Sequence, residues 1–99
     1  MKVFISQPMN GKSDKEILKE RNQAIEKIKE QYTDVEIIES YFDDYEPKNG
    51  CDPLKYLAKS IELLADADLA VFLDGWSQVR GCRMEHLCCV NYGIDMKYL

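Results

Sequence analysis

The order of apolar and polar positions predicts a strand followed by a helix at the start of the chain. A short run of β-type apolar residues extends from Lys2 to Ser6 and stops at Gln7-Pro8, so we expect the first strand there. Ser13-Asp14-Lys15-Glu16 has the pattern of a capping box, which satisfies the free N–H groups of a helix start. Apolar positions then recur at helical spacing, which predicts a first helix that extends to about Gln31.

The alternation of predicted strands and helices continues through the second half of the chain. Asp52-Pro53 is typical of an N-cap followed by the first helical residue, and Gly93 is typical of a helix end. The continuous apolar run over 69–73 predicts a central parallel strand that is buried on both faces. We therefore expect two further helices, over 53–65 and 81–92, and three further strands, over 35–38, 69–73 and 94–99.

This order of elements predicts a single α/β domain over residues 1–99, with helices covering a small parallel sheet. Ligands of such sheets bind beyond the carboxyl ends of the strands, where the loops 7–12, 39–52 and 74–80 would meet. Long loops are often functional, so we consider Tyr41 and Tyr45 of the middle loop as aromatic lid residues. The alternative is that both are ordinary surface tyrosines.

Composition narrows the class of partner. Hydrophobic residues make up 45% of the chain and charged residues 31%, which is the balance of an ordinary globular protein. No apolar run approaches the roughly 20 residues of a membrane span, and the N-terminus resembles a strand rather than a signal peptide. The net charge of −5, with basic and acidic residues interleaved, argues against a nucleic-acid polymer but is compatible with a small nucleotide. We expect a cytoplasmic protein without membrane contacts.

The cysteines indicate no special site. Cys51, Cys82, Cys88 and Cys89 show neither a disulfide framework nor metal-ligand spacing with the only histidine, His86. Reduced, buried thiols of a cytosolic protein explain them better. We therefore expect no metal site and no cofactor.

Glu85 is the carboxylate of greatest chemical interest. It lies in the first turns of the last predicted helix, where free backbone N–H groups favour an anion, and Arg80 and Arg83 are close in sequence. An ionised carboxylate beside a nucleotide sugar can attack the anomeric carbon and hold a covalent glycosyl intermediate. The alternative is a helix-surface glutamate that pairs with an arginine.

Three further positions have two interpretations each. Gly11-Lys12, after the first strand, could present N–H groups and an amine to a phosphate, or could form an ordinary βα turn. Trp76 could stack on a base or cover the core. His86 is more typical of a packing or hydrogen-bonding residue than of a catalyst.

Three segments, 3–12, 67–76 and 80–86, carry a family resemblance when they are taken together. They contain the string Ser-Gln-Pro-Met-Asn-Gly-Lys after the first strand, an Ala-Asp-apolar strand followed by Gly-Trp, and Arg-Gly-x-x-x-Glu-His. In this combination the chain resembles the nucleoside 2-deoxyribosyltransferase-like superfamily. More closely, it resembles the short DUF4406-type proteins common in phages and bacteria, over nearly its whole length.

The resemblance implies a Rossmann-like or flavodoxin-like three-layer sandwich. It also implies cleavage of the N-glycosidic bond of a 2′-deoxynucleoside or its 5′-monophosphate, with transfer of the sugar to another base or to water. Glu85 takes the place of the family's nucleophile, and family members are commonly homo-oligomers, so we expect one here. The ligand-binding residues that we predict are Ser6, Gln7, Pro8, Met9, Gly11, Lys12, Trp76, Arg80 and Gly81.

Two departures from the family pattern leave the activity open. The family's aspartate that assists the base is Ser60 here, and its phosphate-binding serine is Val79. A serine cannot donate a proton at pH 7 as a carboxylic acid can, so Asp74 or His86 would have to replace it, or catalysis is absent. We keep Glu85, Ser60 and Asp74 as candidate catalytic residues. The alternative is a protein, such as a phage protein, that binds a nucleotide or nucleotide-derived signal without turnover.

Overall fold

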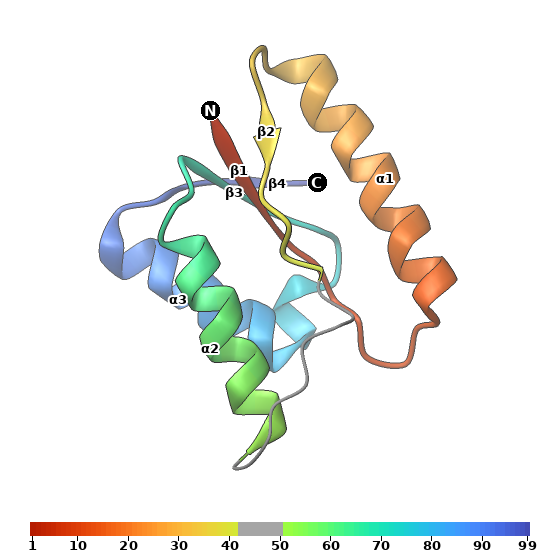
Figure 1. Ribbon diagram of the computed structural model, residues 1–99, viewed down its shortest axis with the longest axis vertical. Coiled ribbons are helices and arrows are strands. Elements are labelled where there is room, and N and C mark those ends of the chain that lie inside the picture. The colour runs from red at the N-terminus through yellow and green to blue at the C-terminus, as the bar shows by residue number, and fades with distance from the viewer. Residues whose placement is uncertain (42–50) are drawn as a thin grey trace.

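A computed structural model of the protein describes residues 1–41 and 51–99 (Figure 1). The elements in chain order are β1 (Lys2–Ser6), α1 (Asp14–Gln31), β2 (Glu36–Ile37), α2 (Asp52–Leu64), β3 (Leu69–Phe72), η1 (Trp76–Gln78), α3 (Arg80–Tyr92) and β4 (Asp95–Tyr98). The helices and strands predicted from the sequence are confirmed, with ends that differ by about one residue. The short 3₁₀ helix η1 was not predicted, and it lies in the loop expected over 74–80.

The strands form one parallel sheet in the order β2-β1-β3-β4. α1 covers one face of the sheet, and α2 and α3 cover the other (Figure 1). This arrangement is the three-layer sandwich of a Rossmann-like or flavodoxin-like α/β fold, as the sequence predicted. The strand order reverses between β1 and β3, because β1 is followed by β2 on one side and flanked by β3 on the other. The carboxyl ends of these two strands are therefore the expected place for a ligand.

Two apolar clusters fill the spaces between the three layers. Side chains of β1 and β3 alternate between the faces, as the pleat of a strand requires. One cluster lies under α1 and contains Val3, Ile5, Ala24, Ile28, Leu69, Val71 and Leu73, and the other lies under α2 and α3 and contains Phe4, Leu64, Ala70, Phe72 and Cys89. Every residue over 69–73 is buried, which confirms the prediction of a central strand covered on both faces.

The helix ends follow the sequence signals with one correction. Ser13 caps α1, because its Oγ accepts a hydrogen bond from the Glu16 N–H at 3.2 Å. Gly93 ends α3 with a φ of 73°, a left-handed conformation that glycine adopts without strain. The prediction of Asp52 as the N-cap of α2 is wrong: Cys51 occupies that position, and Asp52 is the first helical residue. Proline is tolerated throughout the first turn, so an Asp-Pro pair does not fix the cap.

The helices are amphipathic rather than apolar on all sides. α1 buries Ile17, Ala24 and Ile28 against the sheet and carries charged residues on its outer side. Within 1–41 and 51–99, no helix has both the length and the apolar character to cross a bilayer.

Candidate functional site

Three elements bring polar side chains to the carboxyl end of β1. Ser6 is the last residue of β1, Ser60 lies in α2 and Glu85 lies in α3. α3 directs Cys82, Glu85 and Cys89 to the interior. These three are spaced three and four residues apart, so they share one face of the helix. The fold thus places a carboxyl group from the interior face of α3 at the end of the first strand.

Glu85 is buried and bound by two hydroxyl groups. Its side chain is 7% exposed. Ser6 donates its hydroxyl hydrogen to Glu85 Oε1 at 2.7 Å, and the Ser60 hydroxyl also hydrogen-bonds to the carboxylate. The alternative of a surface glutamate paired with an arginine is therefore wrong. Ser60 and Glu85, two of the three candidate catalytic residues, are in contact.

Burial governs the charge of Glu85. It raises the pKa of this carboxyl to about 7, although the hydrogen bonds from Ser6 and Ser60 act in the opposite direction. We expected the start of α3 and the two nearby arginines to favour the anion. That expectation is wrong, because Arg80 and Arg83 are exposed and neither forms an ion pair with Glu85 in the described structure. Glu85 therefore gains and loses its proton near neutral pH, which suits a group that takes part in acid–base or nucleophilic chemistry.

Glu85 lines an open cleft of about 990 Å³. The walls come from the residues after β1, the residues after β2, the first turns of α2 and the start of α3. They include the predicted site residues Gln7, Met9, Ser60, Arg80 and Gly81. Ligand pockets commonly have volumes of roughly 300–1,000 Å³, so a nucleotide fits this space. Among the described residues that line the cleft, Glu85 is the only acidic one.

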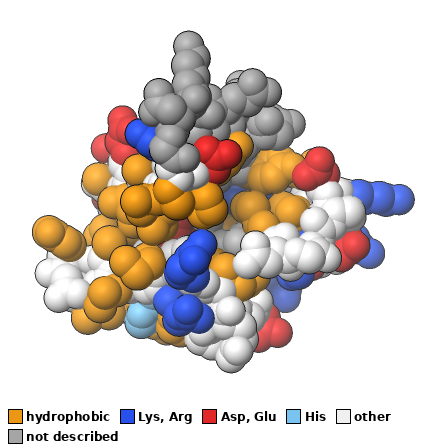
Figure 2. Space-filling model, turned by 90° about the horizontal axis from the view of Figure 1, so that it is seen from below, with side chains coloured by type: hydrophobic (Ala, Val, Ile, Leu, Met, Phe, Trp, Pro, Cys, Tyr) orange, Lys and Arg blue, Asp and Glu red, His pale blue; other side chains and the backbone are white. Residues whose placement is uncertain are grey.

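The start of α3 is open to an anion. Its N-cap, Val79, provides no side-chain hydrogen bond, so the first N–H groups of the helix lack a capping partner. Arg80 and Arg83 line the cleft beside them. A Cβ added to Gly81 would meet nothing within 4 Å, which leaves room next to these N–H groups. In the view from below, basic side chains lie between apolar ones (Figure 2). Free helix N–H groups together with guanidinium groups favour phosphate binding.

Cys82 is a neighbour of Glu85 that the sequence interpretation missed as a site residue. It is buried, lines the cleft and hydrogen-bonds with the Ser6 side chain. Burial raises the pKa of its thiol to about 11, so the thiol stays protonated at neutral pH and does not act as a nucleophile. The spacing of three residues from Glu85 on a predicted helix is the signal that places it here.

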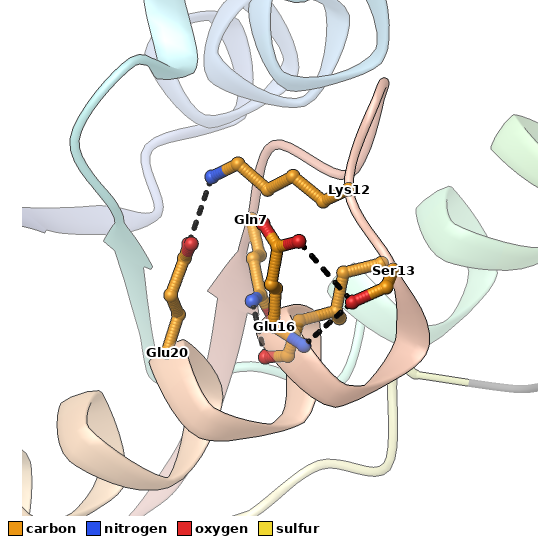
Figure 3. Close-up of polar contacts among 6 residues, drawn as sticks. Gln7, Lys12, Ser13, Glu16 and Glu20 are labelled. Atoms are coloured by element: carbon orange, nitrogen blue, oxygen red, sulfur yellow. Dashed lines mark hydrogen bonds and ion pairs between the residues drawn. The ribbon is translucent and has the colours of Figure 1, made fainter.

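Part of the predicted first-loop site does not line the cleft. Pro8, Gly11 and Lys12 are not among its lining residues, and neither is Ser6, which contacts Glu85 instead. Gly11 has a φ of 76° in a tight turn, and the Lys12 N–H donates to the Met9 carbonyl at 3.2 Å. The Lys12 amine pairs with Glu20 of α1 at 2.8 Å (Figure 3). The geometry is that of the ordinary βα turn that we considered as the alternative to a phosphate loop.

Gln7 is the residue of this loop with an unused acceptor. Its Nε2 donates to the Ile17 carbonyl at 2.7 Å, and a carbonyl only accepts, so the orientation of the amide is fixed. The other amide atom, Oε1, is buried and has no hydrogen-bond partner in the described structure. Gln7 also lines the cleft. A water molecule or a ligand donor that reached Oε1 would therefore remove a cost of about 1–3 kcal/mol.

Trp76 and Asp74 also lie outside the cleft lining. The Trp76 ring stacks on the His86 ring with 4.2 Å between centroids, and it packs against Phe72 of the core. This is the core-covering interpretation of Trp76 rather than the base-stacking one. Asp74 is exposed beyond the end of β3. His86 hydrogen-bonds with Tyr98 of β4, as expected of a packing and hydrogen-bonding histidine.

Of the two tyrosines considered for a lid, Tyr41 lines the cleft and donates its hydroxyl hydrogen to Asp14 of α1 at 2.9 Å. Tyr45 lies outside the described residues. Across 1–41 and 51–99, no group of three or more histidine, cysteine or carboxylate side chains is placed to hold a metal ion.

Residues 1–98 match DUF4406, described as a domain of unknown function. The chain belongs to the DUF4406 family. The match includes the strand, helix and loop residues that form the Glu85 cleft of this DUF4406 protein. No curated protein and no solved structure matches the chain significantly. The resemblance to the nucleoside 2-deoxyribosyltransferase-like superfamily therefore stays a prediction.

Proposed function

We propose that this DUF4406 protein cleaves the N-glycosidic bond of a 2′-deoxynucleoside or its 5′-monophosphate, with Glu85 as the nucleophile. The observation that carries the proposal is the position of Glu85: a buried carboxyl group, held by two serine hydroxyls, in a cleft of nucleotide size. The raised pKa of about 7 keeps a substantial ionised fraction at neutral pH.

The reaction proceeds in two steps. An ionised Glu85 oxygen forms a bond to C1′ of the sugar while the bond from C1′ to the base nitrogen breaks, and the base leaves with that electron pair and takes a proton. Water or the nitrogen of a second base then attacks C1′. The bond from C1′ to Glu85 breaks, the attacking water or base loses a proton to solvent, and the carboxylate is restored. The Ser6 hydrogen bond supports this cycle because it fixes Glu85 Oε1 at 2.7 Å and so orients the carboxyl group in the cleft.

The start of α3 supports recognition of a 5′-phosphate. The uncapped N–H groups, Arg80 and the open space at Gly81 lie in the same cleft as Glu85. The family's phosphate-binding serine is replaced by Val79, but backbone N–H groups bind phosphate without a side chain. Arg80 then supplies the charge that selects a monophosphate over a nucleoside.

Neither Ser60 nor Asp74 is placed to protonate the departing base. Ser60 directs its hydroxyl to Glu85, and Asp74 is not part of the lining. A general acid contributes about 10²–10⁴-fold, so we expect slow turnover in which water supplies the proton.

The cleft that contains Glu85 also favours a second candidate, a protein that binds a nucleotide or nucleotide-derived signal without turnover. A cleft with one carboxyl group among its described lining residues is sufficient for binding. In that case Glu85 in its protonated form donates a hydrogen bond to the ligand instead of attacking it.

One experiment separates the enzyme from the binding protein. The protein is incubated with a panel of deoxynucleosides and their 5′-monophosphates, and the release of free base is measured by chromatography. Glu85→Gln is the test variant, and Glu62→Gln, on the exposed side of α2, is the matched control. Release by the wild type and Glu62→Gln, but not by Glu85→Gln, supports the enzyme. Equal release by all three refutes Glu85 as the nucleophile. If none releases base but a panel member raises the melting temperature, the binding function holds instead.

A further inference from the structure

β4 is an edge strand whose outer side has no partner in the part of the chain that the structure describes. In the sheet order it pairs with β3 alone. Leu99 donates its N–H to Phe72 of β3. Backbone groups alternate in direction along a strand, so those of Asp95 and Lys97 also point to β3, and those of Met96 and Tyr98 point outward. A row of free N–H and C=O groups is a template for another strand.

The side chains of β4 divide between the two faces of the sheet. Met96 packs on the cluster under α2 and α3, and Tyr98 hydrogen-bonds with His86 of α3 at 2.7 Å. Lys97 lies on the opposite face, with its Nζ 5.9 Å from the centre of the Tyr32 ring. Asp95 shares the face of Lys97, because the two are two residues apart. Neither charge forms an ion pair with another described residue.

We propose that β4 pairs antiparallel with β4 of a second copy of this chain, about a twofold axis at Met96. In an antiparallel pair, outward-pointing residues must oppose outward-pointing residues, which permits only a few positions of the axis. An axis at Asp95 or at Lys97 places that residue opposite its own like charge. An axis at Met96 places each Asp95 opposite Lys97 of the second copy, in the closer, non-hydrogen-bonded type of pair. The Met96 backbone groups then exchange hydrogen bonds.

An apolar strip on α3 lies beside this edge. His86 faces β4 through its bond to Tyr98, and Val90 follows one turn later on the same flank. The neighbouring Leu87 extends the strip toward solvent. The side chains of Leu87 and Val90 are 53% and 57% exposed, and that of Tyr98 is 51% exposed. When two sheets join at β4, the two α3 helices lie on the same face and cover these side chains. The strip supplies apolar area that a short strand pair lacks.

Charge reversal combined with sedimentation velocity over a concentration series tests the register. The wild type is expected to dimerise. Asp95→Lys and Lys97→Asp each create two like-charge pairs across the interface. Each should therefore raise the dissociation constant of the dimer by about ten- to a hundredfold. The double variant D95K/K97D restores both pairs and should dimerise. An equimolar mixture of the single variants should also dimerise, because each carries the charge that complements the other. Glu26→Lys and Lys27→Asp, exposed on α1, are matched controls that should behave as the wild type.

A wild type that remains monomeric at its highest soluble concentration overturns the proposal. A wild-type dimer that survives both single reversals places the interface elsewhere and also overturns it. Circular dichroism verifies that each variant is folded, and rescue in the mixture excludes unfolding as the cause of dissociation. Leu87→Glu adds an independent arm: it should weaken the dimer without changing the charges of β4.

Discussion

Ser6 and Glu85 are separated by 79 positions in the sequence, and the fold joins their side chains by a hydrogen bond of 2.7 Å. The bond links the end of β1 to the buried face of α3, beside the point where the strand order reverses. Ser6 stabilises the charged carboxylate in surroundings whose burial favours the neutral acid. The balance leaves the ionisation midpoint of Glu85 near neutral pH, so pH is a direct probe of this site.

Glutamine at position 85 is expected to stabilise the protein at alkaline pH. The pKa of Glu85 is 4.5 without the influence of the fold and about 7 in the folded protein, so the folded state holds this proton more tightly. The resulting stability is complete below about pH 4.5 and is lost as the pH rises through 7. The free energy of unfolding of Glu85→Gln minus that of the wild type should therefore be about 3 kcal/mol larger at pH 8 than at pH 4.5.

Urea unfolding of both proteins at the two pH values measures this difference. Glu62→Gln serves as the control, because Glu62 is exposed and the same substitution there should leave the pH dependence unchanged. A Glu85→Gln variant with the pH dependence of the wild type would show that Glu85 ionises normally in the folded protein.

The rate of base release should rise with pH through about 7 and level off above it. The nucleophile is the ionised form of Glu85, and its fraction grows as the pH passes the pKa of the folded protein. The measurement is kcat/KM for the best substrate of the panel across the neutral range. A rate that falls over this range would assign Glu85 the role of a proton donor and reject it as the nucleophile.

Ser6→Ala should move this midpoint to higher pH. The lost hydrogen bond favours the charged form of Glu85, so its removal raises the pKa of the carboxyl further and lowers the rate at pH 7. The buried carboxyl also loses a donor, which should destabilise the protein by about 1–3 kcal/mol. Ser77→Ala, an exposed serine of η1, is the control. An unchanged midpoint in Ser6→Ala would mean that the hydroxyl does not control the ionisation of Glu85.

Arg80→Ala should weaken the binding of a 5′-monophosphate by about ten- to a hundredfold and leave nucleoside binding nearly unchanged. Arg80 lines the cleft at the uncapped start of α3, where a phosphate has free N–H groups to accept from. Isothermal titration with a matched nucleoside and monophosphate pair distinguishes the two effects. Lys27→Ala, on the exposed side of α1, controls for the lost charge. An equal loss of affinity for both ligands would show that the phosphate does not bind at the start of α3.

The fold was predictable because its signals are local. The N-cap at Ser13, the apolar run over 69–73 and Gly93 each act within a few residues, and each marks an element end or a burial pattern that the structure confirms. The N-cap of α2 was missed by one residue, because Pro53 fits more than one position in a first turn.

The site was predictable only in part, because its properties depend on contacts between distant elements. The sequence identified Glu85, but its burial arises from the packing of α2 and α3 over the end of β1, and no local pattern reports the pKa that results. The pairing of Lys12 with Glu20 and the stacking of Trp76 on His86 likewise arise from tertiary structure. Lys12 and Trp76 have the chemistry expected of a nucleotide site, but in this structure each interacts with another residue of the same chain.

Trapping the glycosyl intermediate during turnover and locating it by mass spectrometry of peptides tests Glu85 as the nucleophile. The wild type is mixed with the deoxynucleoside or monophosphate panel, quenched in acid and digested with a protease. With Glu85 as the nucleophile, we expect an added sugar or sugar-phosphate mass on the peptide that contains Glu85, and no such adduct in Glu85→Gln. Base release with the sugar attached to a different residue, or an adduct that persists in Glu85→Gln, would contradict it.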